Sequence, residues 1–395
     1  MNASIYHIAI PMLQPFNHAK SDRHLSESIV FCLEHRGVIG LGECAPRIYV
    51  TGESISSVID SIIQIDIESL INKIEFSTLD SAINSFNKIE IFSKKTRPQP
   101  LNAICAIEMA IMDLIGKLFN TSISEIIKRH YLPKNLVNID NKSFITTQVM
   151  DFSQDTLDFL ELRKPFHFIK IKLGKDYRYN LKRVKKVRES VGHSIPISVD
   201  ANMSWSELEA QEMIKMLRPF GIAYYEEPLK KGSLLAYKKL REKHQAKILL
   251  DESVCSLDDA HQAIKNNACD ALNIRISKCG GIINSIRLIE LAVKKNLDFQ
   301  IGAQVAETGP LIAAGRQLIS AIEKYYFTYE AGQPDRFFER NNFIVDPMPC
   351  VNRSNNLAYG LIEPGLGVNP SKSIDSNVIN KIIWDKSKRW QSITA

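Results

Sequence analysis

Eight short apolar runs rich in β-forming residues recur between residues 145 and 330, and this repetition constrains the fold more than any other feature. They return roughly every 25 residues with helical stretches between them, which is the period of a parallel β/α barrel. An open doubly wound sheet is the alternative, but no Gly-x-Gly-x-x-Gly fingerprint follows the first run. The barrel is therefore favoured. The runs are Ile145–Met150, Phe168–Leu173, Ile195–Asp200, Ile222–Glu227, Ala246–Glu252, Ala271–Ser277, Asp298–Ala303 and Tyr325–Glu330.

The first third of the chain has a different pattern. Ile5–Ile10 and Ser26–Glu34 predict strands, and Gly37–Glu43 predicts a turn and a third strand of a small antiparallel sheet. From about residue 54 to residue 128 the apolar spacing becomes helical, with an apolar stripe before Gly116. This part of the chain is therefore expected to be an α+β domain.

The chain length leaves room for both units. At 395 residues, the chain can hold a barrel of about 250 residues and a companion domain. We expect residues 1–125 to form the N-terminal α+β domain and residues 126–340 the barrel. Residues 341–395 are expected to return to the N-terminal domain.

Charged residues fall at the carboxyl ends of the predicted barrel strands, where barrel active sites are built. Asp200, Glu226 and Asp251 end three consecutive runs, so one βα unit separates each acid from the next. A single acid at a strand end more often caps a helix or binds backbone amides. Three acids in register would repel each other unless a cation compensates them. Oxygen ligands without His or Cys predict a hard divalent ion, with magnesium first and manganese second.

Lysines flank this predicted metal site. Strand alternation directs Lys170 and Lys172 to the same side, and like-charge repulsion is expected to lower the pKa of each. A lysine perturbed in this way can act as a base. Lys278 follows the sixth run, on the opposite wall of an eight-stranded barrel. We expect Lys172 to be the base nearer to the substrate and Lys170 to hold its neighbour in place through an ion pair. Taken alone, each lysine could equally be an ordinary surface residue.

Composition excludes several other classes of protein. The net charge of +6 comes from 50 basic and 44 acidic side chains that are scattered along the chain, so nucleic-acid binding is not favoured. The seven cysteines form no Cys-x-x-Cys pair, which argues against a disulfide framework or a zinc site and fits a cytoplasmic protein. No signal pattern and no membrane-spanning apolar run are present, so no membrane partner is expected.

Five short motifs together resemble the enolase superfamily, and more narrowly its mandelate racemase and muconate-lactonizing subgroup. The resemblance covers nearly the whole chain, including the helix Ala106–Lys117 and the turn Pro364–Gly367. It implies a modified (β/α)7β TIM-type barrel under an N-terminal α+β capping domain, commonly in a homo-oligomer. The motifs are Lys170-Ile171-Lys172, Asp200-Ala201-Asn202, Glu226-Glu227-Pro228, Asp251-Glu252-Ser253 and Lys278-Cys279-Gly280-Gly281.

The resemblance also implies a role for each matching residue. Asp200, Glu226 and Asp251 would bind magnesium. Glu252 and Asn202 would contact these ligands without binding the metal themselves. Lys172 and Lys278 would be the acid/base pair. The substrate would be a small carboxylate that loses its α-proton to give an enediolate, whose charge the metal stabilises.

Substrate contacts are expected from the capping loops and the last two barrel strands. Arg47 and Tyr49 are candidates for binding a distal group, with loop solvation as the alternative. Glu307 matches a glutamate near the seventh strand of cycloisomerase-like members. Dipeptide epimerases that resemble this chain carry an Asp-x-Asp pair on the eighth strand, whereas this chain has Tyr329-Glu330 there. Glu330 is thus a candidate contact, and the dipeptide hypothesis is weakened.

Three functions remain open at this point. The leading hypothesis is an isomerase, either a cycloisomerase or an epimerase/racemase, because two opposed lysines allow protonation on either face. The second is a lyase of the o-succinylbenzoate synthase or acid-sugar dehydratase type. The third is a non-catalytic binding protein on the same fold, whose mark would be a missing lysine or acid, and none is missing.

Overall fold

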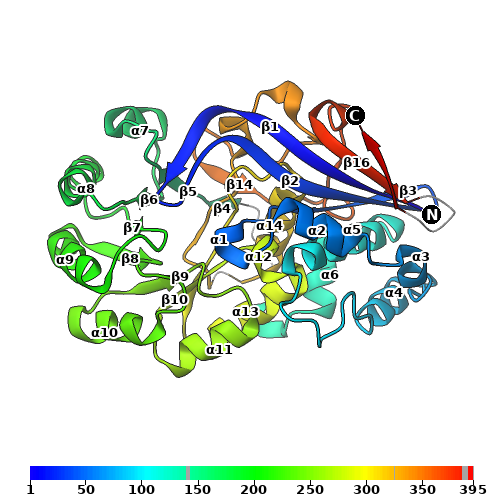
Figure 1. Cartoon of the computed structure of the whole chain (residues 1–395), viewed down its shortest axis with the longest axis horizontal. Helices are drawn as coiled ribbons and strands as arrows, with labels where there is room; N and C mark the ends of the chain where they lie inside the picture. Colours follow the sequence, from blue (N-terminus) through cyan, green and yellow to red (C-terminus); the bar gives the residue numbers. More distant parts are fainter. Residues whose placement is uncertain (139–142, 324, 385–389, 395) are drawn as a thin grey trace.

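A computed structural model describes residues 1–138, 143–323, 325–384 and 390–394 of the chain. Within these residues the protein has two parts, a cap built on an antiparallel sheet and a parallel eight-stranded barrel (Figure 1). The α/β barrel and the α+β cap predicted from the sequence are therefore confirmed. No described helix is long and apolar enough to cross a membrane.

The cap sheet has five strands in the order β17-β16-β1-β2-β3. Its two longest strands form a hairpin that extends from the cap to the barrel (Figure 1). Asn17 in the hairpin accepts a hydrogen bond from the backbone N–H of Phe152 (3.0 Å), which fixes the hairpin against the barrel. The strands are β1 (Asn2–His18), β2 (Ser21–His35), β3 (Val38–Cys44), β16 (Val378–Trp384) and β17 (Trp390–Thr394).

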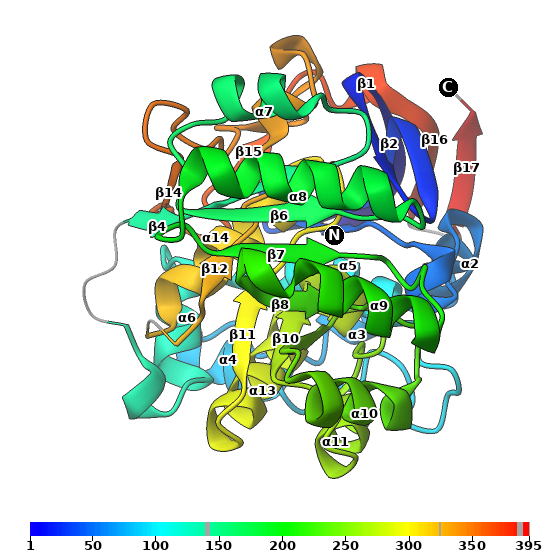
Figure 2. The same cartoon turned by 90° about the vertical axis from the view of Figure 1, so that its left-hand side faces the viewer.

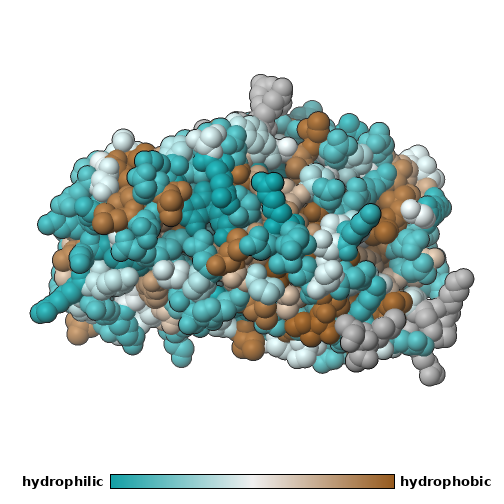
Figure 3. Space-filling model, turned by 90° about the horizontal axis from the view of Figure 1, so that it is seen from above, coloured by the Kyte–Doolittle hydropathy of each residue, from teal (hydrophilic) through white to brown (hydrophobic). Residues whose placement is uncertain are grey.

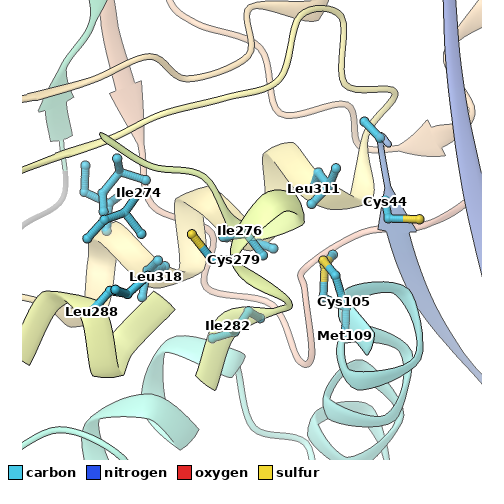
Figure 4. Close-up of a cluster of buried hydrophobic side chains, with 14 of the residues drawn as sticks. Cys44, Cys105, Met109, Ile274, Ile276, Cys279, Ile282, Leu288, Leu311 and Leu318 are labelled. Atoms are coloured by element: carbon cyan, nitrogen blue, oxygen red, sulfur yellow. The ribbon is translucent and has the colours of Figure 1, made fainter. Parts of the chain in front are cut away.

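Helices pack against this sheet, and the central one is α5. The approach of α5 to β3 requires glycine, because a Cβ at Gly42 would overlap the carbonyl oxygen of Ala106. Figure 4 shows Cys44 of β3 and Cys105 and Met109 of α5 beside apolar side chains of the barrel, so the two parts share a core. The cap helices are α1 (Ile48–Thr51), α2 (Ile55–Ile62), α3 (Ile67–Ile71), α4 (Leu79–Phe86), α5 (Leu101–Leu118) and α6 (Ile123–His130).

The barrel sheet is parallel, and its strands follow one another in the order β5 to β12. Each of the eight predicted runs supplies one of these strands. An isolated bridge between Thr146 and Tyr329 brings the two edges of the sheet together. The strands are β5 (Thr147–Met150), β6 (Phe168–Lys172), β7 (Ile197–Asp200), β8 (Ile222–Glu226), β9 (Ile248–Leu250), β10 (Ala271–Ile274), β11 (Asp298–Ile301) and β12 (Thr328–Tyr329).

Helices surround the barrel strands (Figure 2). Several begin with a capping side chain, such as Ser206 before α9 and Ser256 before α11, each of which accepts a hydrogen bond from the third residue of its helix. The helices are α7 (Thr156–Leu162), α8 (Tyr177–Val191), α9 (Glu207–Leu217), α10 (Leu234–His244), α11 (Leu257–Lys265), α12 (Ile276–Cys279), α13 (Ile282–Lys294) and α14 (Pro310–Ala321).

The chain after β12 turns through a 3-10 helix at Pro334–Arg336 and then passes back along both parts. Four short strands make two small sheets in and near this segment, and β16 then pairs with β1 in the cap. The short strands are β4 (Ser143–Ile145), β13 (Val345–Asp346), β14 (Leu357–Tyr359) and β15 (Asn369–Pro370). On the face shown in Figure 3, hydrophilic side chains predominate and hydrophobic patches are scattered among them.

Candidate active site

The register of the barrel strands brings the candidate acids to one level. Lys172 at the end of β6 lies opposite Asp200 at the end of β7, and Asp200 lies opposite Glu226 at the end of β8. Asp251 follows β9 directly. Because the strands are parallel and adjacent, all these side chains lie at the carboxyl end of the barrel, and all three acids are buried.

Each of these acids is paired with a basic side chain. Lys170 Nζ lies 2.5 Å from Glu226 Oε2, and Lys172 Nζ lies 2.5 Å from Asp200 Oδ2. Lys278 Nζ lies 2.9 Å from Asp251 Oδ1, and Arg275 forms a second ion pair with Asp251. The site is therefore a buried network of alternating charges.

This network corrects the predicted pKa values of the lysines. Burial lowers the pKa of Lys172, but the attraction of Asp200 and Glu226 outweighs both burial and the repulsion from Lys170, so the pKa is raised. The pKa of Lys170 is also raised, because Glu226 and Glu330 outweigh burial. Lys170 does lower the pKa of Lys172, as predicted, but the nearby carboxylates outweigh this repulsion. The prediction of a net lowering of both lysine pKa values was therefore wrong for this arrangement of charges. The expected ion-pairing role of Lys170 matches its contacts with Glu226 and Glu330.

A cavity opens beside this network. Lys170 and Lys172 line it from the barrel, and Phe16, His18 and Tyr49 line it from the cap. The hydroxyl of Tyr49 lies 3.4 Å from His18 Nε2. Burial, together with the nearby Lys172, lowers the pKa of His18 to about 2, so this imidazole is neutral at pH 7. The cap thus contributes one wall of the site.

Two of the other candidate substrate contacts lie outside the lining of this cavity. Arg47 is buried, and its guanidinium donates to the carbonyl oxygens of Glu27 (3.1 Å), Pro46 (2.8 Å) and Val305 (3.2 Å). Glu307 is also buried and accepts a hydrogen bond from the backbone N–H of Gln304 (2.8 Å). The bond from Arg47 to Val305 holds the segment between β11 and α14 against the cap, and the bond between Gln304 and Glu307 lies within that segment.

Glu330 does line the cavity, but its carboxylate is already engaged. Its Oε1 pairs with Lys170, and its Oε2 accepts a hydrogen bond from the backbone N–H of Ala303 (2.7 Å). Lys278 does not line the cavity. Its ammonium is enclosed and donates to the carbonyl oxygens of Asp251 and Val254.

Buried polar residues behind the acids hold them in place. Asn202 accepts a hydrogen bond from Lys172 Nζ (3.0 Å) and donates to Glu252 Oε1 (3.1 Å). Glu227 accepts hydrogen bonds from the backbone N–H groups of Asp251 (2.7 Å) and Ser253 (3.2 Å). Asn202 therefore links Glu252 to Lys172, and its backbone N–H donates to Asp200 Oδ1 (2.8 Å).

Sequence reasoning missed Arg275, which lines the cavity and pairs with Asp251. The signal was available, because the alternation that selected Lys170 and Lys172 also selects Asn273 on β10 and Arg275 directly after it. Asn273 donates to Glu226 Oε1 (2.8 Å). By contrast, Arg163 and Arg336, which also line the cavity, come from loop positions that belong to no motif.

The donor chemistry of the three acids fits a hard divalent cation. They offer only oxygen, and Glu226 Oε2 and Asp251 Oδ1 are buried and accept no well-formed hydrogen bond, each facing a lysine ammonium. Within the part of the chain that the structure describes, no three His, Cys, Asp or Glu side chains are arranged closely enough to hold a metal ion. Each acid is instead paired with a basic side chain.

Family models match most of the chain. The model of the mandelate racemase / muconate lactonizing enzyme N-terminal domain matches residues 2–127, and that of the enolase C-terminal domain-like family matches residues 157–374. The L-Ala-D/L-Glu epimerase of Clostridium acetobutylicum is 26% identical over 328 residues, covering 81% of this chain and 87% of the relative. The N-succinyl-L-Arg/Lys racemase of Bacillus cereus is 27% identical over 333 residues, covering 81% and 85%.

Solved structures show the same fold. The crystal structure of the Bacillus cereus racemase has a TM-score of 0.80 at 23% identity and covers 97% of this chain and 99% of its own. The dipeptide epimerase of Enterococcus faecalis, in complex with Mg and the dipeptide L-Leu-L-Tyr, has a TM-score of 0.76 at 22% identity, with 93% and 99% covered. Together with the strand-end acids and lysines, the family matches show that the chain belongs to the mandelate racemase / muconate lactonizing enzyme group of the enolase superfamily.

Proposed function

We propose that the protein is a magnesium-dependent isomerase that removes the proton next to a substrate carboxylate and returns a proton to the same carbon. The observation that carries this proposal is the pairing of Lys172 and Lys278 with two acids of one strand-end set. The lysines come from β6 and from α12 after β10, and three strands separate β6 from β10 in the barrel sheet. Two proton-transfer groups on opposite walls suit racemisation or epimerisation.

Asp200, Glu226 and Asp251 are the residues that would hold the magnesium ion. When bound, the ion would supply Lewis-acid stabilisation of the negative charge that develops on the substrate carboxylate. Lys172 would transfer the proton on one face of the α-carbon and Lys278 on the other. Lys170 would hold Glu226 and Glu330 in place. The presence of Mg in the complex of the Enterococcus faecalis relative supports this choice of metal.

The charge of the cavity favours an N-acylated amino acid over a free dipeptide as the substrate. Among the residues that the structure describes, five cationic side chains line the cavity, against one carboxylate, that of Glu330. Since Glu330 is already paired with Lys170, it does not offer a free acid to a substrate ammonium group. A substrate whose nitrogen is acylated carries no such positive charge. The cationic residues are Lys170, Lys172, Arg163, Arg275 and Arg336.

One observation favours a second candidate function, in which a single base acts. Lys278 is fully buried and does not line the cavity. If its ammonium only steadies the developing charge, Lys172 alone would transfer the proton. The reaction would then be a cycloisomerisation or a β-elimination, and relatives of this group include a chloromuconate cycloisomerase.

The proposal is tested first through the metal. We expect chelation to abolish turnover and added magnesium to restore it, because the charge on the substrate carboxylate would lose its main stabilisation. Asp251→Asn should lose both magnesium binding, measured by calorimetry, and turnover, whereas Asp258→Asn on the exposed side of α11 should keep both. Full turnover by the chelated protein would rule the proposal out.

The reaction itself is tested by incubating N-acylated amino acids with the enzyme in deuterium oxide. Exchange of the α-proton, followed by NMR, together with loss of optical rotation would support the isomerase. Loss of water or of another β-substituent would support the lyase.

A further inference from the structure

Two arginines lie where the catalytic cavity leads outward. Arg163 directly follows α7, and Arg336 ends the 3-10 turn Pro334–Arg336. Both line the catalytic cavity, and with Gln154 they also line a neighbouring groove. None of the active-site lysines lines that groove. The two guanidinium groups therefore mark the part of the cavity that lies toward the groove.

Neither guanidinium has a carboxylate partner among the residues that the structure describes. Arg336 donates to the side-chain oxygen of Asn356 (3.0 Å), and its Nε is buried without a partner. Arg163 Nη2 lies 3.1 Å from the side-chain oxygen of Gln154 when that amide is oriented to satisfy both of its polar atoms. Asp335 is paired with Arg353 at 2.5 Å. Neither guanidinium therefore forms an ion pair with a described residue, although Asp335 offsets part of the charge of both from a distance.

Two of the remaining acids around these arginines, Asp151 and Asp155, accept hydrogen bonds from other groups. Asp151 accepts hydrogen bonds from the backbone N–H of Asn17 (2.8 Å) and from the hydroxyl of Ser153 (2.7 Å). Asp155 caps α7 through the backbone N–H of Leu157 (2.7 Å). Asp158 lines only the neighbouring groove and not the catalytic cavity. Among the described residues that line the cavity, Glu330 is the only acid, and it is paired with Lys170.

One buried side chain fixes both arginines. Asn356 donates from Nδ2 to the carbonyl oxygens of Arg163 (2.6 Å) and Pro165 (2.7 Å), while its Oδ1 accepts from Arg336. The cap closes over the same turn, because the backbone N–H of Leu13 donates to the carbonyl oxygen of Phe337 (2.8 Å). Asn356 thus fixes the guanidinium of Arg336 and the backbone of Arg163 before any ligand arrives, which lowers the entropy cost of binding.

Burial and mutual repulsion make these cations costly in the free protein. Burial, together with neighbouring arginines, lowers the pKa of Arg163 to about 10 and that of Arg336 to about 9, although Asp335 opposes both shifts. Both groups are still charged at pH 7. A buried charge without a partner is unfavourable, and an anion placed between two guanidinium groups would remove that cost through charge-assisted hydrogen bonds.

We propose that Arg163 and Arg336 bind a second carboxylate of the substrate, distant from the carboxylate next to the reacting carbon. The inference rests on the proposed function and narrows its substrate class to dianionic N-acyl amino acids. The second carboxylate comes either from a dicarboxylic acyl group or from an acidic amino-acid side chain. Both sources present the same planar anion to the two guanidinium groups.

The test compares dianionic probes with their neutral amides by calorimetry in the presence of magnesium. N-succinylglycine carries the second carboxylate on the acyl group, and N-acetylglutamate carries it on the side chain. Their neutral counterparts are N-succinamoylglycine and N-acetylglutamine. We expect at least one dianionic probe to bind about tenfold tighter than its amide, the usual effect of one lost charge-assisted contact. Which pair shows the difference identifies the source of the carboxylate.

Variants then locate the effect. Arg163→Gln and Arg336→Gln should each remove most of the preference for the dianionic probe, and Arg336→Lys should keep part of it, which guards against a variant that fails to fold. Arg178→Gln, which alters an exposed arginine of α8 that lines neither the cavity nor the groove, should keep the full preference. Equal binding of each probe and its amide, binding of no probe, or an undiminished preference in Arg163→Gln and Arg336→Gln would overturn the inference. A protein that shows the preference but exchanges no α-proton would instead disprove the proposed reaction alone.

Discussion

Lys172 and Lys278 are the residues on which a two-face reaction depends. If each handles the proton on its own face of the α-carbon, neither can replace the other. Lys172→Ala should then stop exchange from one enantiomer and Lys278→Ala from the other, each by about 100- to 10,000-fold, the usual contribution of a proton-transfer group. Exchange is measured by NMR in deuterium oxide, with Lys175→Ala on the exposed loop after β6 as the control.

The two variants also separate the reaction classes. Normal exchange and turnover by Lys278→Ala would show that its ammonium, enclosed beside Asp251, only steadies charge. The cycloisomerase or lyase reaction would then replace racemisation as the leading hypothesis. Magnesium binding should stay intact in both variants, which distinguishes loss of a base from loss of the site.

At the scale of single residues, the sequence predicted the positions of the side chains better than it predicted their pKa shifts. Period-two alternation was enough to place Lys170 and Lys172 on one side of a strand. It could not show that Asp200 and Glu226 would lie within 2.5 Å of them and raise the pKa of each. The direction of a pKa shift depends on every charge around the group, and those charges come from several strands.

At the scale of elements, the barrel strands could be predicted because each is a short apolar run between helical stretches. The position of Lys278 was harder to predict. It lies on α12, a helical turn after β10, and not on an extended strand. The helix after that turn is held from the cap, because Glu108 on α5 accepts a hydrogen bond from the backbone N–H of Ile283 in the first turn of α13 (3.0 Å). Such a contact between distant segments leaves no local pattern.

Glu108 gives a prediction of its own at this scale. Burial raises its pKa to about 7, so the folded protein holds this proton more tightly than the unfolded chain does. The stability that comes from this proton is complete below the ordinary glutamate pKa and is lost as the pH rises to about 7. Glu108→Gln keeps the acceptor and removes the titration. We expect a higher urea midpoint than wild type above pH 7, by up to about 3 kcal/mol in stability, and a flatter pH dependence between pH 5 and 7.

The control for this prediction is Glu189→Gln on the exposed side of α8. Its unfolding midpoint should follow the wild-type curve at every pH. A Glu108→Gln protein with the same pH dependence as wild type would show that Glu108 does not titrate in this range.

At the scale of the whole molecule, the cap and the barrel meet through contacts that no single motif encodes. Cap and barrel side chains share one core (Figure 4). The hairpin of β1 and β2 supplies Phe16 and His18 to the cavity, and the segment after β11 supplies Ala303 to Ala306. Apolar periodicity indicates that each part has a core, but not which faces meet. The cavity therefore emerges only when the two parts are placed together.

Glu43 tests whether this junction supports the site. It lies on β3 of the cap, yet its carboxylate accepts hydrogen bonds from the backbone N–H groups of Thr308 (2.7 Å), Gly309 (3.2 Å) and Leu311 (2.9 Å) at the start of α14. Each carboxylate oxygen faces at least two donors, because the Thr308 hydroxyl also donates to Oε1 (2.8 Å). In Glu43→Gln, either amide orientation would set an NH2 group against N–H donors.

We therefore expect Glu43→Gln to lower the free energy of unfolding by about 1–3 kcal/mol, the cost of leaving buried donors without an acceptor. It should also slow α-proton exchange, because the same segment carries Ala303 to Ala306 into the cavity wall. Glu34→Gln on the neighbouring strand β2, which loses only a contact with Asn2, should change neither quantity. Loss of stability with normal exchange would mean that the junction holds the cap without shaping the site, whereas loss of both would show that the cap positions the wall of the cavity.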